Sequence, residues 1–245
     1  MRIATWNLDR SRPGIKRKRQ QDAMAQIKDI DVWVLTESFR DLAPGPDYEL
    51  KSYSSDAVLD RDSEHGECWV TIWTRKDAAI KVQLKADLER AAAVRLVDSG
   101  VVVVGTVLPW LTDDRHPEVR GEAAFLARLS EQSEDWLRLR DEASGELCVA
   151  GDFNQDLLSE GHYYGSGGGR TALRDAFHKC GLDCLTGGKD DPLAGHAGLA
   201  SVDHIAITGL RAVGERRSTV WPAPGTLNRT LLSDHYGVWA EVVQV

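Results

Sequence analysis

Four strand-like runs follow one another between residues 67 and 108 with no helix between them, and this feature constrains the fold most. The runs cover residues 67–75, 78–84, 92–97 and 101–108. The last two flank Asp98-Ser99-Gly100, a turn sequence typical of a β-hairpin. Parallel neighbours need long crossover connections, which are usually helices. The pattern therefore favours antiparallel or mixed sheets over a doubly wound parallel fold.

The rest of the chain predicts further strands and three helices. Helical spacing covers 15–29, 118–142 and 171–180, and strands are expected at 2–8, 31–36, 147–150, 201–208 and 236–243, with a polar loop rich in Pro and Gly before residue 48. So many apolar strands are buried best when two sheets pack face to face with helices outside. We therefore expect one α/β domain spanning residues 1–245, with two packed, mixed, largely antiparallel sheets.

Charge and cysteine content limit the partners and the compartment. The net charge of −8 argues against a protein that coats nucleic acid non-specifically. One basic run nevertheless stands out, and it is either a solvated helix face or a phosphate-contacting segment: Arg10, Arg12, Lys16, Arg17, Lys18 and Arg19. No apolar run is long enough to span a bilayer and the N-terminus does not resemble a signal peptide, so we expect a cytoplasmic protein. The four cysteines, which lack zinc-ligand spacing, are expected to be reduced and structural.

Polar residues follow several predicted strands. The run 147–150 stops at Gly151 and then presents Asp152 and Asn154, which point to the same side of an extended chain. Taken alone, Gly-Asp-Phe-Asn favours a plain turn, since Gly, Asp and Asn are turn formers. Four other strand-like segments also end in isolated polar residues, namely Asn7, Glu37, Asp203 and the pair Asp234-His235. We interpret these five ends as parts of one site, the alternative being unrelated caps and surface residues.

Five short motifs at these ends resemble those of the endonuclease/exonuclease/phosphatase superfamily, in the same order along the chain. They are Thr5-Trp6-Asn7, Leu35-Thr36-Glu37, Gly151-Asp152-Phe153-Asn154, Val202-Asp203-His204-Ile205 and Ser233-Asp234-His235. The resemblance spans nearly the whole chain. It implies a four-layer α-β-β-α sandwich and metal-dependent hydrolysis of phosphate esters, as in deoxyribonucleases, abasic-site endonucleases, sphingomyelinases and inositol polyphosphate phosphatases.

Oxygen-rich side chains suit a hard divalent cation, so we expect Asn7, Glu37 and Asp234 to hold Mg²⁺, with Mn²⁺ as an alternative. Asp152 is expected to orient and deprotonate the attacking water, and Asn154 to donate hydrogen bonds to a phosphoryl oxygen. The resemblance implies that His235 contacts the phosphate or shares in proton transfer, while Asp203 fixes its ring and raises its pKa.

One position departs from the family pattern. Many relatives carry His or Tyr where this chain has Val107, which neither donates a proton nor binds an oxyanion. His116 and Arg120 are the nearest substitutes, although His116 before Pro117 is also consistent with an ordinary loop residue. Glu67 resembles an acidic position of some nuclease relatives. The full set of expected substrate contacts is Arg10, Arg40, Trp110, His116 and Arg120.

The leading functional hypothesis is a metal-dependent phosphodiesterase acting on DNA or RNA as a monomer without a membrane span. The basic run supports it, as do loop aromatics able to stack on bases: Trp110, Tyr163, Tyr164 and Trp221. One alternative is a phosphatase or phosphodiesterase for a small phosphorylated metabolite or a lipid head group. A second is a catalytically silent binding protein that retains the fold.

Overall fold

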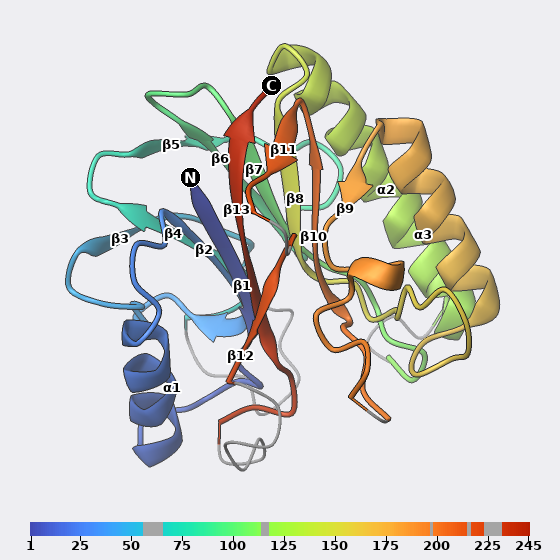
Figure 1. Cartoon of the computed structure of the whole chain (residues 1–245), viewed down its shortest axis with the longest axis horizontal. Helices are drawn as coiled ribbons and strands as arrows, with labels where there is room; N and C mark the ends of the chain where they lie inside the picture. Colours follow the sequence, from blue (N-terminus) through green and yellow to red (C-terminus); the bar gives the residue numbers. More distant parts are fainter. Residues whose placement is uncertain (56–65, 114–117, 197, 215–216, 223–231) are drawn as a thin grey trace.

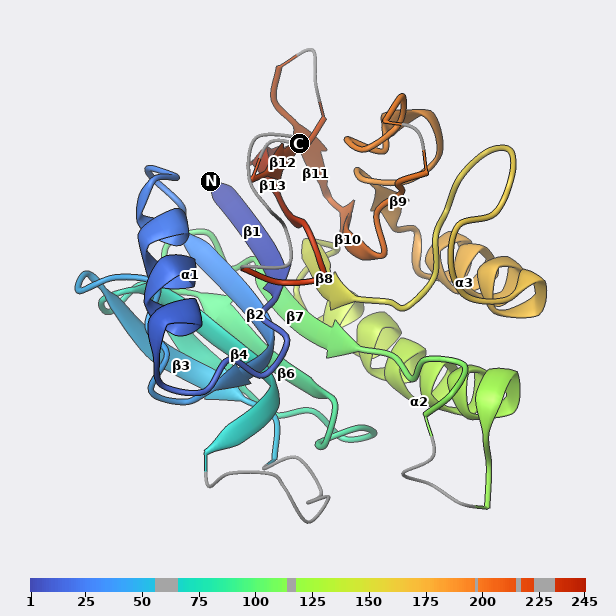
Figure 2. The ribbon, with the colours of Figure 1, turned by 90° about the horizontal axis from the view of Figure 1, so that it is seen from below.

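Two β-sheets pack face to face, and helices cover both outer faces (Figures 1 and 2). The computed structural model describes residues 1–55, 66–113, 118–196, 198–214, 217–222 and 232–245. Figure 2 shows α1 (Ile15–Ala25) on one side of the strands, with α2 (Gly121–Glu142) and α3 (Gly167–Cys180) on the other. The expected four-layer α-β-β-α sandwich is confirmed.

The first sheet has the strand order β11-β13-β1-β2-β4-β3, with β12 also paired to β13. Its strands are β1 (Arg2–Asn7), β2 (Val32–Phe39), β3 (Tyr48–Tyr53), β4 (Glu67–Arg75), β11 (Leu210–Ala212), β12 (Thr219–Trp221) and β13 (Gly237–Gln244). The β1–β2 pair is parallel and the other described pairs of this sheet are antiparallel.

The second sheet has the order β5-β6-β7-β8-β10-β9. Its strands are β5 (Ala79–Val82), β6 (Ala91–Leu96), β7 (Val102–Val107), β8 (Leu147–Asp152), β9 (Asp183–Cys184) and β10 (Asp203–Thr208). Here β7 and β8 are parallel, and the other described pairs are antiparallel. The mixed, largely antiparallel character predicted from residues 67–108 is confirmed.

Three hydrophobic clusters fill the three spaces between the layers. The cluster between the sheets contains Val34, Val70, Val103 and Ile205 among others. Phe125, Trp136, Phe153 and Phe177 belong to the cluster beneath α2 and α3, whereas Trp6, Met24, Trp33 and Trp221 belong to the cluster on the α1 side. Because the central strands of each sheet are buried on both faces, they are largely apolar, and the polar strand ends stand out against this pattern.

The predicted element boundaries differ from the structure in a few places. Helix α1 ends at Ala25 rather than residue 29, and α2 begins at Gly121 rather than residue 118. Helix α3 begins inside the Gly-rich stretch, because the Ser166 side chain accepts a hydrogen bond from the Gly169 amide (2.9 Å) and caps the first turn.

The expected loop before residue 48 is wrong in part, since β2 continues to Phe39 and β3 begins at Tyr48. The short strands β9, β11 and β12 were not predicted, because two or three residues carry no detectable periodicity and their pairing depends on neighbouring strands.

All four cysteines are free, and three of them are buried.

No helix in the described ranges is long and apolar enough to cross a membrane.

Candidate active site

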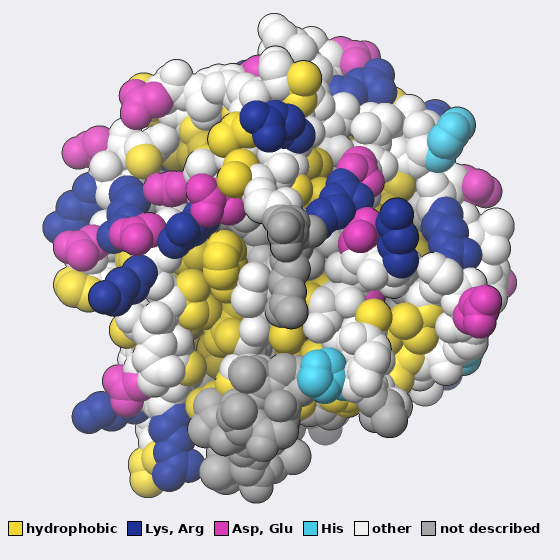
Figure 3. All heavy atoms as spheres, viewed as in Figure 1, with side chains coloured by type: hydrophobic (Ala, Val, Ile, Leu, Met, Phe, Trp, Pro, Cys, Tyr) yellow, Lys and Arg dark blue, Asp and Glu magenta, His cyan; other side chains and the backbone are white. Residues whose placement is uncertain are grey.

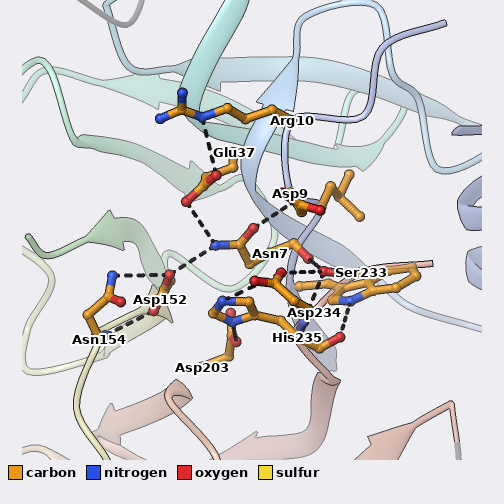
Figure 4. Close-up of polar contacts among 12 residues, drawn as sticks. Asn7, Asp9, Arg10, Glu37, Asp152, Asn154, Asp203, Ser233, Asp234 and His235 are labelled. Atoms are coloured by element: carbon orange, nitrogen blue, oxygen red, sulfur yellow. Dashed lines mark hydrogen bonds and ion pairs between the residues drawn. The ribbon is translucent and has the colours of Figure 1, made fainter. Parts of the chain in front are cut away.

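The polar strand ends meet at one edge of the sandwich (Figure 4). In the first sheet, the parallel register pairs Asn7 with Thr36, which places Asn7 beside Glu37. In the second sheet, the antiparallel register pairs Asp152 directly with Asp203. His235 precedes β13, which pairs with β1. The two packed sheets therefore bring together residues from all five motifs.

Asn7 links the two sheets through its side-chain amide. Its Nδ2 donates to Asp152 Oδ2 (2.9 Å) and Glu37 Oε1 (3.3 Å), and Figure 4 shows it between these two carboxylates. Its Oδ1 accepts a hydrogen bond from the Asp9 amide (2.8 Å), which fixes the orientation of the group. Asn7 thus holds the buried carboxylate of Asp152 close to the partly buried carboxylate of Glu37, and one lone pair of its oxygen remains for a cation.

Glu37 has an unusual backbone and an unusual charge environment. Its φ of 45° lies in the left-handed region, a conformation that non-glycine residues adopt rarely and that clusters at functional sites. Arg10 Nε lies 3.3 Å from Glu37 Oε2 and 3.2 Å from Glu67 Oε1. Burial raises the pKa of Glu37, Arg10 opposes the shift and Asp152 adds to it. A bound divalent cation would relieve this clustering of negative charge.

Asp152 is buried and held by three hydrogen bonds. Its Oδ1 accepts from the Asn154 amide (2.9 Å), and its Oδ2 accepts from the side chains of Asn7 and Asn154. Burial raises the pKa of Asp152 to about 6, a value suited to a general base near neutral pH. A side chain on Gly151 would lie 1.9 Å from the Thr106 carbonyl oxygen, so glycine is required where β8 delivers Asp152 beside β7.

The side-chain amide of Asn154 forms hydrogen bonds within the protein. It has a positive φ of 50°, and its Nδ2 donates to the Leu108 carbonyl (2.9 Å) and to Asp152 Oδ2 (3.2 Å). Both amide hydrogens are therefore used inside the protein. In this arrangement Asn154 orients Asp152, and its expected donation to a phosphoryl oxygen stays a prediction that requires one of these bonds to be exchanged.

His235 and Asp203 form a close pair, with His235 Nδ1 lying 2.6 Å from Asp203 Oδ2. Burial alone would lower the pKa of His235, but the carboxylates of Asp203 and Asp152 raise it well above the ordinary value. The imidazole is therefore positively charged at neutral pH, and Nε2 faces outward, 3.9 Å from Asp234 Oδ1. The Asp234 side chain is 66% exposed.

Ser233 supports this pair, a role that the sequence did not suggest. Its Oγ donates to the Asn7 carbonyl (2.7 Å) and accepts from the His235 amide (3.1 Å). Trp6 Nε1 donates to the His235 carbonyl (3.1 Å). The segment before β13 is thus fixed against the end of β1. The sequence signal that could have indicated this contact is the position of Ser233 inside the Ser-Asp-His motif.

The donor set fits a divalent cation. The ligating atoms of Asp152, Asp203 and His235 lie within 4.8 Å of one another. Asp203 Oδ1 is buried and has no hydrogen-bond partner in the part of the chain that the structure describes. Carboxylate and amide oxygens are the ligands that Mg²⁺ prefers. Near Glu37, the Asn7 atom that contacts the carboxylate in this structure is the amide nitrogen, whereas the Asn7 oxygen accepts from the Asp9 amide.

The expected substrate contacts are distributed unevenly. Arg10 lies at the site, where its guanidinium also stacks 4.9 Å from the centre of the Trp69 ring. Trp110 contacts the same ring (6.1 Å between centroids). Arg40 stacks on Tyr53, and Arg120 is the exposed N-cap residue of α2. His116 lies outside the described residues.

Val107 is fully buried between the sheets, in register with Asp152 of the neighbouring strand. The end of β7 therefore offers an apolar surface where the end of β8 offers a carboxylate.

A pocket of about 200 Å³ opens onto the site. It is lined by Asn154, Tyr163, Tyr164, Asp203, Asp234 and His235, among others. On the molecular face in Figure 3, basic and acidic side chains are interspersed rather than gathered into one basic band.

The sequence model of the endonuclease/exonuclease/phosphatase family matches residues 4–235. No curated protein matches the sequence. Among solved structures, a 3′ phosphatase from Neisseria bound to its product DNA hairpin is 18% identical, with a TM-score of 0.66 and 98% of each chain covered. An AP endonuclease from Archaeoglobus fulgidus is 16% identical, with a TM-score of 0.66 and 98% of each chain covered. A mannosyl-6-phosphatase from Bacteroides thetaiotaomicron is 17% identical, with a TM-score of 0.64 and 99% of each chain covered.

Proposed function

Because the chain belongs to the endonuclease/exonuclease/phosphatase family, we propose that it is a divalent-metal-dependent phosphoesterase that hydrolyses phosphodiester bonds in nucleic acid. One observation supports this most: a single amide, that of Asn7, bridges the partly buried carboxylate of Glu37 and the buried carboxylate of Asp152. Two carboxylates held this close, one of them buried, destabilise a fold unless a cation or a reaction uses them.

Glu37 is the principal cation ligand in this proposal, with Asn7 beside it and Asp234 as a further oxygen donor. Mg²⁺ is the preferred ion and Mn²⁺ an alternative. Such an ion, when bound, polarises the phosphoryl group and stabilises the leaving oxygen.

Asp152 accepts the proton of the attacking water. Its pKa, raised to about 6, lies close to neutral pH, which suits a general base. Its three hydrogen bonds fix the direction of its oxygens. Charged His235, oriented by Asp203, binds the phosphoryl oxygens through Nε2 as charge develops on them. These roles account for the burial of the whole network.

A nucleic-acid substrate is supported by the aromatic side chains beside the site. Tyr163 and Tyr164 are 38% and 39% exposed and line the pocket next to Asp203, so each is accessible for stacking on a base. The Neisseria structure with a DNA hairpin and the Archaeoglobus endonuclease have the same fold.

A small phosphorylated metabolite is the second candidate substrate. The basic run is partly neutralised within the protein, since Lys16 pairs with Asp9 and Arg17 with Asp41. A pocket of about 200 Å³ suits a single phosphorylated group, and the Bacteroides mannosyl-6-phosphatase has this fold too. We further propose that the protein acts as a monomer in the cytoplasm, where four free cysteines remain reduced.

A substrate panel tests the proposal. The purified protein is incubated with plasmid DNA, end-labelled DNA and RNA oligonucleotides, bis-p-nitrophenyl phosphate, sugar phosphates and inositol phosphates, with Mg²⁺, Mn²⁺ or EDTA. We expect cleavage of nucleic acid and of bis-p-nitrophenyl phosphate that EDTA abolishes. Turnover of sugar or inositol phosphates alone would favour the second candidate. No metal-dependent turnover of any substrate would contradict the enzymatic function and leave a binding protein.

A further inference from the structure

Tyr164 lines the pocket at the site, and its hydroxyl has no hydrogen-bond partner among the described residues. Tyr164 lines the same pocket as Asn154, Asp203 and His235, and its side chain is 39% exposed. Across the described ranges no group forms a hydrogen bond with this hydroxyl. It is therefore free to bond a ligand in the pocket.

The backbone around Tyr164 is fixed by Asp156, which lies two residues after Asn154. Asp156 Oδ2 accepts hydrogen bonds from the amides of Tyr163 (2.8 Å) and Tyr164 (2.9 Å), and the Asp156 amide donates to the Tyr164 carbonyl (3.2 Å). The Asp156 side chain is fully buried, and Arg170 pairs with it at 3.1 Å. A buried carboxylate that accepts two neighbouring amides leaves the segment little freedom.

Gln155 ties the same loop to the second sheet. Its side-chain oxygen accepts from the Ser166 amide (2.9 Å), and its carbonyl lies 2.9 Å from His204 Nε2. A Cβ on Gly165 would lie 2.1 Å from the Gln155 Oε1 atom, so the loop packs closely against this side chain. The tyrosine is therefore held at a set distance from β10, the strand that carries Asp203.

The carboxylates of the site affect the pKa of the Tyr164 hydroxyl. Burial, followed by the negative charges of Asp152, Asp234 and Glu37, raises the pKa of Tyr164. The hydroxyl therefore keeps its proton at neutral and mildly alkaline pH and can act as a hydrogen-bond donor.

We infer that the Tyr164 hydroxyl donates a hydrogen bond to the phosphoryl group of the bound substrate, and that Asp156 is the positioning residue that holds it there. The site needs such a donor, because the amide hydrogens of Asn154 are used within the protein and Val107 carries none. This inference rests on the proposed function, and it assigns a substrate-contacting residue on a loop outside the five motifs.

Tyr164→Phe removes only the hydroxyl, and Tyr53→Phe, on an exposed tyrosine of β3 outside this pocket, is the matched control. We expect Tyr164→Phe to lower kcat/KM for bis-p-nitrophenyl phosphate by about tenfold to a hundredfold, the range for one hydrogen bond to a charged group. It should weaken binding of inorganic phosphate to the Mg²⁺-loaded protein, measured by calorimetry, in the same direction. Tyr53→Phe should change both values by less than about threefold.

The outcomes separate the two claims. If the wild-type protein turns over substrate and binds phosphate but Tyr164→Phe matches it, or if Tyr53→Phe loses as much as Tyr164→Phe, the assignment of this hydroxyl is wrong. If the wild-type protein shows neither turnover nor phosphate binding, the proposed function itself fails.

Asp156→Asn tests the positioning role. We expect kcat/KM to fall, and the effect to be largely absent in a Tyr164→Phe background, because both changes act on the same hydroxyl. Fully additive losses would show that Asp156 acts on the site by another route and would contradict its positioning role.

Discussion

The ends of β7 and β8 lie side by side in one parallel pair, yet they carry opposite chemistry. Asp152 at the end of β8 belongs to a buried polar network with Asn7 and Asn154. Val107, its register partner on β7, belongs to the apolar core between the sheets.

The Val107 amide donates to the carbonyl of Arg90 (2.9 Å), whose fully buried side chain is stacked on Trp69 and Trp110 and paired with Asp113. One half of the site is thus built from strand ends, whereas the half beside β7 depends on groups that loops supply.

The largest expected effect comes from removing the negative charge of Asp152 at the end of β8. Asp152→Asn should lower kcat for bis-p-nitrophenyl phosphate by about a thousandfold, since general-base catalysis contributes about 10²–10⁴. Circular dichroism should show an unchanged fold. Asp175→Asn, an exposed change on α3, serves as the control and should retain wild-type turnover. A rate near wild type for Asp152→Asn would show that another group activates the water.

Glu37→Gln should remove the principal ligand of the proposed cation and leave the apolar end of β7 at Val107 unchanged. We expect turnover at a fixed Mg²⁺ concentration to fall by about a hundredfold, on the scale of altered metal sites, and Mg²⁺ binding measured by calorimetry to weaken. Glu134→Gln, on the exposed face of α2, is the matched control. Unchanged Mg²⁺ affinity in Glu37→Gln would move the cation site to another set of residues.

The pH profile should report the ionisation of Asp152. A base must be deprotonated, and the pKa of Asp152 is raised to about 6, so kcat/KM should fall about tenfold per unit as pH drops below that value. A bound cation lowers this pKa, so the acidic limb should move to lower pH as the Mg²⁺ concentration rises. The charge on His235 is present at low pH and lost as pH rises through its raised pKa, which predicts a second limb on the alkaline side. A limb that does not move with Mg²⁺ would separate the base from the metal site.

Val107→His tests the apolar side by placing an imidazole in register with Asp152. Because Val107 is fully buried between the sheets, the unpartnered ring should lower the free energy of unfolding by about 1–3 kcal/mol. We expect turnover to gain less than a few-fold. Denaturant unfolding and steady-state kinetics measure both. A tenfold gain in turnover without loss of stability would show that this position opens into the site.

The smallest effect is expected in the basic run. Lys18 and Arg19 are exposed, whereas Lys16 and Arg17 are paired with Asp9 and Asp41. Replacing both exposed residues by Gln should reduce the salt dependence of DNA binding by a slope of at most about 2. An unchanged slope, measured by fluorescence anisotropy at several salt concentrations, would leave these residues as a solvated helix face.

The strand ends were predictable because the central strands, which are buried on both faces, are largely apolar. An isolated Asn7, Glu37 or Asp203 at the end of such a run contrasts with its surroundings. Pairing between β8 and β10 then places Asp152 opposite Asp203 without further information. The lengths of the apolar strand-like runs and their order relative to the helical segments were likewise sufficient to predict the layered fold.

The supporting contacts were not predictable to the same degree. Ser233 reaches Asn7 across 226 positions, and Asp156 fixes a loop whose path depends on packing against α3. Neither contact leaves a periodic pattern in the sequence. The pairing of Arg10 with Glu37 also required coordinates, because a basic residue near a predicted site is equally consistent with binding a phosphate.

The most direct test of the account is the position of a bound cation. Crystals soaked in Mn²⁺ would be measured near the manganese absorption edge, and an anomalous difference map would locate the ion. The account predicts a peak bonded to a Glu37 carboxylate oxygen, at the junction of the two sheets beside Asn7 and Asp152. A well-occupied peak elsewhere, with none at Glu37, would contradict it.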